Sequence, residues 1–252
     1  MLWLVVSSCN KYTAEIAKNL LKLQILYLSL RSVLSISNII ELLKKEFLLE
    51  FRQKTSLASI LLYVLSIVFI SFLSFKSGIR PDVWAALFWI VIFFAGINAA
   101  SKSFFTENKY RSMYNYTIYH PTEFVLSKMV YNILLIWVVV LCSFLCFGWM
   151  ISYPVQNSLL FFITLLLGGA ALAGSLTLMS CIASKTGNSY SVMSLLSMPV
   201  CIPVLLLALR LTRNAVDGLE WSVSYSFLGG LLLIDLIIFT LSLFLFRYLW
   251  KE

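Results

Sequence analysis

Six long apolar runs, separated by polar stretches, dominate this chain and limit what it can fold into. In a lipid bilayer every backbone amide needs a hydrogen bond inside its own segment, so an apolar run crosses roughly 30 Å of hydrocarbon as a helix of about 20 residues. Hydrophobic residues make up 61% of the chain and charged residues 12%, whereas about a quarter of a soluble domain is charged. We therefore predict an all-α polytopic membrane protein with six transmembrane helices, at about residues 57–75, 84–105, 130–151, 159–183, 192–209 and 227–246.

An even number of spans places both termini on one side of the membrane, and the basic residues indicate which side. Cytoplasmic loops carry an excess of Lys and Arg. Fifteen of the 19 basic residues lie on the side of the two termini, and four lie in the opposite loops. We therefore expect both termini in the cytoplasm. The net charge of +8 then reflects topology, and it favours anionic membrane lipid over nucleic acid as a partner.

Residues 1–38 precede the predicted six-helix domain at 39–252 and form an N-terminal extension. Two interpretations of it stay open. The first is an amphipathic helix at the membrane surface over about residues 14–34, and the second is a true start that lies further into the sequence. A lipoprotein signal ending at Cys9 fits less well, because the apolar run before this cysteine is short and has no basic residue ahead of it.

The stretch from 38 to 54 has the pattern of a helix that lies in the cytoplasmic interface of the membrane. At about 100° per residue, the apolar residues at 40, 43, 47 and 51 share one face, and Lys45 and Arg52 lie opposite. Glu46 and Glu50 fall at the edge of the apolar face, so the pattern is imperfect. A plain topology anchor and a functional element both fit such a helix.

The longest polar interval between apolar runs, residues 102–128, contains the only histidine, His120. The chain has no phosphate-binding loop, since the Lys-Thr-Gly at 185–187 has the wrong order and spacing, so it does not hydrolyse ATP by itself. One histidine in a cytoplasmic loop argues against tight haem binding. Cys142 and Cys146 share a helix face but have no evident third ligand nearby. We therefore expect no bound metal or cofactor and no catalytic residue.

Asp235 is the only carboxylate deep inside a predicted span. A charged group that faces lipid at the centre of a helix costs a few kcal/mol, so we expect this side chain to face other helices or water. Two roles stay open for it: a structural hydrogen bond within the bundle, and a contribution to substrate movement or gating.

The fourth and fifth spans carry packing signals. Gly169 and Ala173 have the small-xxx-small spacing that lets two helices approach closely, and Gly174 belongs to a second such pair. Pro199 and Pro203 each remove a helix hydrogen bond, so we expect the fifth span to be kinked or broken. Close contact and a broken helix suit a moving subunit interface, although packing within the chain explains the small residues equally well.

Three stretches carry a family resemblance: KKEFLLEFRQK at 44–54, TENKYRSMYNYTIYHPTEFVLSK at 106–128, and the fourth and fifth spans at 165–210. They resemble the type-2 ABC (ABC-2) exporter permeases and, because of the Pro-xxx-Pro in the fifth span, the CcmB family (haem exporter protein B) among them. The resemblance covers about residues 40–250 and implies a type V exporter-like architecture in a bacterial cytoplasmic (inner) membrane. The run at 111–114 departs from the Gly-Ser/Thr-Leu-Glu of many relatives.

The resemblance also implies partners and a mechanism. Two permease copies would pair with two copies of a separate ATP-binding subunit, CcmA, and would act with CcmC, CcmD and the haem chaperone CcmE in cytochrome c maturation. Haem would be a substrate of the complex, either exported or released on CcmE. The alternatives are an ABC-2 permease that exports a lipid, glycan or drug, and a membrane scaffold without transport. The segment that couples to the ATPase would present Glu107, Tyr110, Met113, Tyr114, Tyr116 and Pro121.

Overall fold

The computed structural model of this chain describes residues 36–52, 54–75, 79–105, 121–151, 154–184 and 189–249. Within these ranges every regular element is an α-helix, so the all-α prediction is confirmed. The helices are α2 (Ile36–Arg52), α3 (Lys54–Ser74), α4 (Pro81–Phe105), α6 (Pro121–Met150), α7 (Ser158–Ala183), α8 (Ser189–Val216) and α9 (Trp221–Leu249).

Five of the described helices are long and apolar enough to cross a membrane, as expected for a polytopic membrane protein. In α3 the described apolar stretch, Ala58–Ser74, is shorter, so the first of the six predicted spans stays a prediction. The five long stretches are Pro81–Lys102, Thr122–Met150, Ser158–Ala183, Ser191–Val216 and Trp221–Leu245.

Several helices extend beyond the predicted membrane spans, whose approximate bounds follow the hydropathy. α6 begins at Pro121 rather than near residue 130, so the polar interval between α4 and α6 is shorter than the predicted 102–128. α8 continues to Val216 rather than ending near 209, and α9 begins at Trp221 rather than near 227. A helix does not end where charges begin if those charges are paired or reach water.

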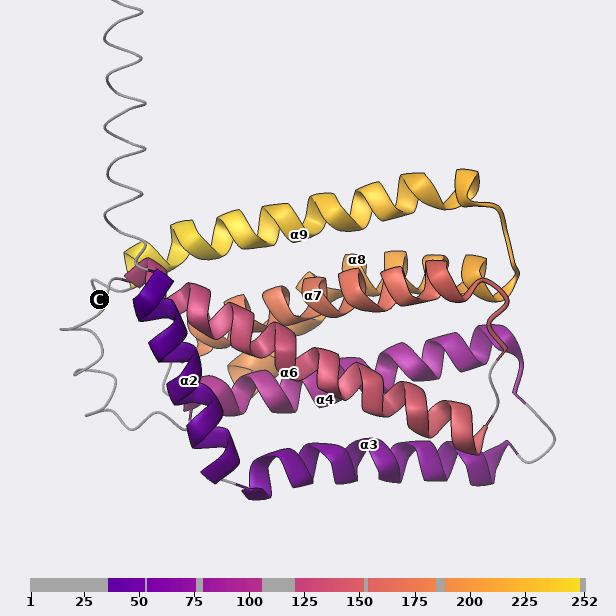
Figure 1. Ribbon diagram of the computed structural model, residues 1–252, viewed down its shortest axis with the longest axis horizontal. Coiled ribbons are helices and arrows are strands. Elements are labelled where there is room, and N and C mark those ends of the chain that lie inside the picture. Colours follow the sequence, from indigo (N-terminus) through magenta and orange to yellow (C-terminus); the bar gives the residue numbers. More distant parts are fainter. Residues whose placement is uncertain are drawn as a thin grey trace, which may run out of the picture.

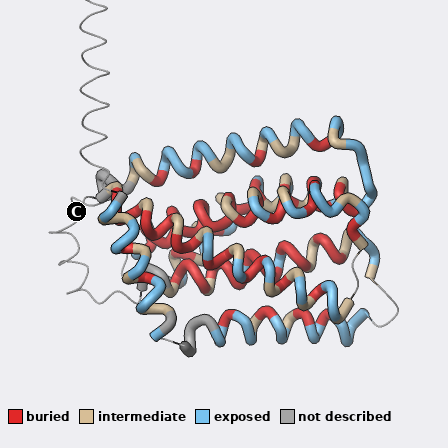
Figure 2. Tube along the Cα trace, in the orientation of Figure 1, coloured by how far each residue is buried: buried red, intermediate tan, exposed pale blue. Residues whose placement is uncertain are grey.

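The six apolar helices lie side by side and alternate in direction along the bundle, and α2 lies across one end of it (Figure 1). The C-terminal end of α9 lies at this same end. α7 is the central helix, since it packs against α4, α6, α8 and α9. The inner faces of the bundle are buried, while α9 is largely exposed along its length (Figure 2). The exposed apolar side chains form the surface that a membrane would cover.

A cluster of aromatic rings lies at the end of the bundle opposite α2. Trp84 stacks on Phe88 with ring centroids 5.3 Å apart, and Phe147 of α6 meets Trp84 edge-on at 5.8 Å. Phe161 of α7 contacts the same rings at about 6.0 Å. All four side chains are buried. Aromatic pairs of this kind contribute about 0.5–1.5 kcal/mol each beyond the burial of their area, so this end of the bundle is held by apolar packing.

The start of α7 is fixed by local hydrogen bonds. Asn157 is its N-cap residue, and the side-chain oxygen of Asn157 accepts a hydrogen bond from the backbone N–H of Leu160 at 3.2 Å. The backbone N–H groups of Gln156 and Asn157 both donate to the carbonyl oxygen of Ala215. An N-cap of this kind stabilises a helix by about 1 kcal/mol. These bonds fix where the central helix begins relative to the end of α8.

Candidate functional site: a polar junction between α2 and α6

The predicted coupling residues between α4 and α6 mostly lie outside the described residues. This applies to five of the six, namely Glu107, Tyr110, Met113, Tyr114 and Tyr116. Pro121, the sixth, is the first residue of α6. Proline is favoured at the first position of a helix, because its missing N–H would have no partner there and its fixed φ suits the helix. The structure thus describes the two helices that flank the 106–120 segment, and its docking role stays a prediction.

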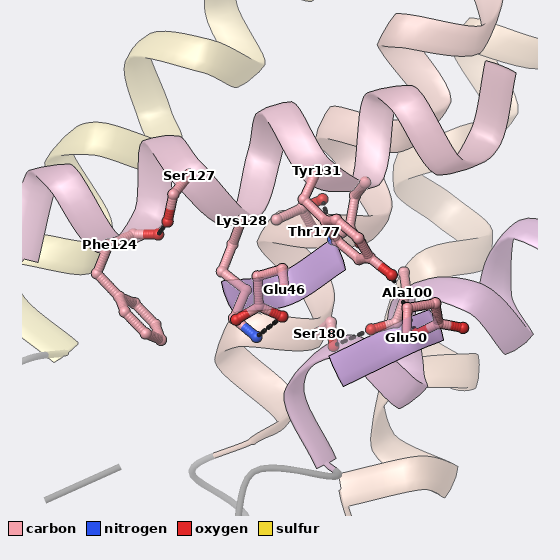
Figure 3. Close-up of polar contacts among 10 residues, drawn as sticks. Glu46, Glu50, Ala100, Phe124, Ser127, Lys128, Tyr131, Thr177 and Ser180 are labelled. Carbon is pink, nitrogen blue, oxygen red and sulfur yellow. Dashed lines mark hydrogen bonds and ion pairs between the residues drawn. The ribbon is translucent and has the colours of Figure 1, made fainter. Parts of the chain in front are cut away.

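Three polar contacts join α2 to the N-terminal part of α6. Figure 3 shows the residues of two of them, Glu46 with Lys128 and Glu50 with Tyr131. Asn38 Nδ2 donates to Glu123 Oε2 at 3.1 Å. Lys128 Nζ lies 3.0 Å from Glu46 Oε2 in an ion pair, and the Tyr131 hydroxyl donates to Glu50 Oε2 at 3.0 Å. We call this set of six residues the polar junction: Asn38, Glu46 and Glu50 on α2, and Glu123, Lys128 and Tyr131 on α6.

The ion pair of the polar junction is almost fully removed from solvent. The exposed fraction of the side chain is 1% for Lys128 and 8% for Glu46. The Lys128 ammonium also lies 5.7 Å from the centroid of the Phe124 ring, within the range of a cation–π contact. Loss of one partner from a buried pair is costly, because the other charge is left buried without compensation. The pair therefore fixes the position of α2 along α6.

Apolar contacts complete the packing between the two helices. The Phe47 ring meets the Tyr131 ring edge-on, with centroids 5.5 Å apart, and Leu42 of α2 is 1% exposed. Oε1 of Glu50 is buried and has no hydrogen-bond partner among the described residues. The carboxylate of Glu50 thus depends on Tyr131 for the one hydrogen bond that the described chain gives it.

The helix on the other side of the 106–120 segment, α4, is also tied to its neighbours. Near its C-terminal end, the carbonyl oxygen of Ala100 accepts a hydrogen bond from the Ser180 hydroxyl of α7 at 3.1 Å (Figure 3). Lys102 Nζ donates to the Ser59 hydroxyl of α3. Both helices that flank the segment are therefore bonded to other parts of the bundle close to where the segment joins them.

Most residues of the polar junction were not predicted as site residues. Glu46 and Glu50 were noted as flaws in the amphipathic pattern of the helix at 38–54, which the structure confirms as α2. They are not flaws, because both carboxylates face α6 rather than water. The available signal was their spacing: two carboxylates four residues apart at the edge of an apolar face suggest a polar partner on a neighbouring helix.

The small residues predicted for helix packing are buried inside this chain. A Cβ added at Gly169 would lie 3.1 Å from Cδ1 of Trp137 on α6, and one added at Gly174 would lie 3.2 Å from Cγ2 of Ile238 on α9. Ala173 is 0% exposed. These residues therefore receive side chains from α6 and α9, which corresponds to the alternative of packing within the chain.

A neighbouring glycine that the sequence analysis did not single out has the tightest contact of this kind. A Cβ added at Gly168 would lie 2.5 Å from Cη2 of Trp89 on α4. The same indole donates a hydrogen bond from Nε1 to Oγ1 of Thr212 on α8 at 2.8 Å. Gly168 thus makes room for a tryptophan that links α4 to α8 beside α7. The Gly-Gly pair at 168–169 was the available signal.

Pro199 and Pro203 do not break the fifth span. α8 is continuous from Ser189 to Val216, with both prolines inside it. Of the two expected outcomes, a kinked or a broken helix, the break does not occur and the kink stays a prediction. Both prolines lie on the exposed side of α8. Each removes one N–H donor and leaves a carbonyl one turn earlier without its helical partner. The helix continues because its other backbone bonds persist and its buried side packs against α7 and α4.

Asp235 lies near the middle of α9 and is half-buried. Within the described part of the chain its carboxylate makes no hydrogen bond or ion pair. The side chain of Asn98, a polar residue of α4, donates to the carbonyl oxygen of Phe94 in its own helix. The described helices thus supply no hydrogen bond to this carboxylate, and both predicted roles of Asp235 stay predictions.

The cysteines of the described helices are all free. Cys142 and Cys146 are half-buried on α6, and Cys181 and Cys201 are buried. In the ranges that the structure describes, no group of three His, Cys, Asp or Glu side chains could hold a metal ion. His120 lies outside those ranges.

A bundle of membrane-length apolar helices, with a further helix held across its end by buried polar contacts, defines an α-helical integral membrane protein. Comparison with protein families adds that the family model described as CcmB protein matches residues 37–244. The chain belongs to the CcmB family, which confirms the resemblance and places it among the ABC transporter permeases of cytochrome c biogenesis. Comparison with curated proteins gave no match.

Proposed function

We propose that this chain is the membrane permease subunit of an ABC transporter complex that handles haem during cytochrome c maturation, and that it is driven by a separate ATP-binding subunit. The observation that carries this proposal is the polar junction. It lies on the first turns of α6, where the 106–120 segment joins the bundle. Since three polar contacts hold α2 to these turns, a movement of the segment displaces α6 and α2 together.

The proposed driver is CcmA, which docks on the 106–120 segment. Tyr110, Met113, Tyr114 and Tyr116 supply aromatic and apolar side chains for a groove on the ATPase, and Pro121 marks the change from the segment to α6. Glu107 adds a charge near the end of α4. Because α4 and α6 are each bonded to other helices close to the segment, work done on the segment reaches α3 and α7 as well as α2.

The proposed topology has six spans, with both termini in the cytoplasm of a bacterial inner membrane. α3 is 21 residues long, which suffices to cross the hydrocarbon, and it lies beside α4 and α6. The end of the bundle that carries α2 also carries basic residues such as Lys44, Lys45 and Lys102. An excess of basic residues is typical of the cytoplasmic side.

The proposed cargo step is export of haem or ATP-driven release of haem-loaded CcmE, together with CcmC and CcmD. The chain contains one histidine, His120, and proteins that hold haem tightly usually supply an axial ligand such as histidine. This composition favours an arrangement in which the partner proteins hold the haem. The permease, in two copies, then transmits the work of ATP hydrolysis.

The test uses a strain that lacks this gene and expresses the full chain with the changes Tyr114→Ala and Pro121→Ala. We expect loss of CcmA co-purification, accumulation of haem-loaded CcmE and loss of covalent haem in c-type cytochromes. The matched control is Trp149→Ala, because this aromatic side chain is 89% exposed near the C-terminal end of α6, at the opposite end of the bundle. It should leave all three readouts unchanged.

Each failure of this test has its own meaning. Intact CcmA binding in the double variant would reject the coupling segment. Normal c-type cytochromes in the deletion strain would reject the role in haem handling and favour export of a lipid, glycan or drug. If a CcmA variant that binds but does not hydrolyse ATP supported full cytochrome maturation, the chain would be a scaffold rather than a driven permease.

A further inference from the structure

Asp235 is an acidic side chain near the middle of a membrane-length helix, and the described bundle provides no hydrogen bond for it. The buried hydroxyls of Ser143 and Ser242 also lack a partner, but they are neutral. Asn132 donates to Thr177 at 2.9 Å, and the Thr240 hydroxyl donates to the carbonyl oxygen of Leu236. The carboxylate of Asp235 has no such bond within the described chain. A carboxylate at membrane depth is stable only with a hydrogen-bond donor, a cation or water beside it.

The position of Asp235 on α9 makes this carboxylate reachable from outside the chain. Leu231 and Ile238 are buried and form the inward stripe of α9. Asp235 lies at the edge of this stripe, and Leu232 and Phe239 next to it are 51% and 42% exposed. The carboxylate therefore borders the outward surface of α9, which is largely exposed along its length (Figure 2).

The outward residues around Asp235 follow the spacing of a helix–helix interface. We call the stripe of Tyr225, Leu228, Leu232, Asp235 and Phe239 the Asp235 stripe; its members are three and four residues apart in alternation. This spacing matches the a and d positions along which two helices pack at a shallow angle. A partner helix on this stripe would cover apolar side chains on both sides of the carboxylate.

We propose that the Asp235 stripe is the docking site for a transmembrane helix of a different protein, one that places an Arg, Lys, Asn or Gln side chain at the depth of Asp235. A second copy of this chain does not fit. Two copies related by an axis along the membrane normal would bring Asp235 against Asp235, and two acceptors of like charge repel. A donor from another protein gives the carboxylate the bond that it lacks. The proposal requires only that α9 crosses the membrane, so it is independent of ATPase coupling.

The test places a photo-crosslinking amino acid in the full-length chain, in the membranes of its own host. One version carries it at Leu232, on the Asp235 stripe, and the control carries it at Ile237, on the opposite outward side of α9 and 59% exposed. We expect a discrete crosslinked membrane protein from position 232 only. The crosslinked peptide must contain an Arg, Lys, Asn or Gln within an apolar segment.

Substitution of the carboxylate separates a specific bond from mere proximity. Asp235→Leu should lower the crosslink yield about tenfold, as expected for loss of a charge-assisted hydrogen bond, whereas Asp235→Asn should keep part of it. Leu is compatible with an apolar helix, and the amount of chain in the membrane checks that it still inserts. In the crosslinked protein, substitution of the Arg, Lys, Asn or Gln by Leu should lower the crosslink yield by the same factor. Combining this substitution with Asp235→Leu should lower the yield no further.

Three results would overturn the proposal. The first is adducts with lipid alone from both positions. The second is a crosslink between two copies of this chain, and the third is a yield that Asp235→Leu leaves unchanged.

Discussion

The buried ion pair of the polar junction allows a quantitative prediction for Lys128→Met. Methionine fills a volume similar to that of the lysine stem but removes the charge that lies 3.0 Å from Glu46 Oε2. At an effective dielectric constant near 20, two unit charges at that distance attract each other by about 5 kcal/mol. The Glu46 carboxylate, 8% exposed, would be left buried without its cation. We expect the free energy of unfolding to fall by about 3–5 kcal/mol.

Substitution of Lys128 and substitution of Glu46 should lower the free energy of unfolding by different amounts. Lys128→Met leaves the buried Glu46 carboxylate without its cation. Glu46→Gln leaves Lys128 an amide oxygen that can accept its hydrogen bond, and the Phe124 ring stays beside the ammonium group. The lysine change should therefore cost more than the glutamate change. The double variant Glu46→Leu with Lys128→Met should recover most of the loss, since an apolar pair can replace a buried ion pair at little cost.

The assay is reversible unfolding of the purified full-length chain in mixed detergent micelles, followed by circular dichroism. The control is Arg80→Met, which removes an ion pair of similar length, 2.9 Å to Asp82, whose side chains are 81% and 38% exposed. An exposed pair contributes at most about 1 kcal/mol. The reasoning would be refuted if Lys128→Met matched this control, or if the double variant lost as much as the sum of the two single variants.

Two further predictions use the same unfolding assay. Gly168→Ala should lower the free energy of unfolding by about 1–3 kcal/mol, because the new methyl group would lie 2.5 Å from the Trp89 indole and overpack the core. The control is Gly148→Ala, which should be neutral or slightly stabilising because a Cβ at this position would have no atom within 4 Å. Tyr131→Phe should cost about 1–3 kcal/mol, because it removes the hydrogen bond to Glu50 and leaves both oxygens of that carboxylate without a partner. Loss of less than half a kcal/mol in either variant would contradict the contact it tests.

The apolar helices could be predicted from the sequence because a bilayer imposes a minimum apolar length on each of them. The same criterion did not indicate that the helix of the third span begins nine residues before the predicted span, at Pro121, because Glu123 and Lys128 looked like loop residues. Both side chains are 1% exposed in the folded chain, because α2 supplies a partner for each of them. Hydropathy measures a residue by itself and contains no information about a partner on another helix.

The candidate site illustrates the same limit. Residues Glu50 and Tyr131 are 81 positions apart in the chain, and no periodic pattern links residues at that distance. The prolines of α8 show a related limit: proline weakens a helix locally, but packing of the opposite side of α8 keeps the helix continuous, which the sequence could not predict. Asp235 was recognised as unusual from the sequence alone, because an isolated charge in an apolar run needs no knowledge of the fold to be noticed.

The long stretch of chain between α2 and Lys128 has a consequence for biosynthesis. α2 leaves the ribosome long before the helix that carries its countercharge, and at 5–20 residues per second the 81 residues between Glu50 and Tyr131 take roughly 4–16 s to make. During that interval the two carboxylates of α2 have to remain hydrated, so the helix waits at the membrane surface. α2 becomes buried only after α6 is inserted, so the assembly of this end of the bundle depends on the synthesis of Lys128.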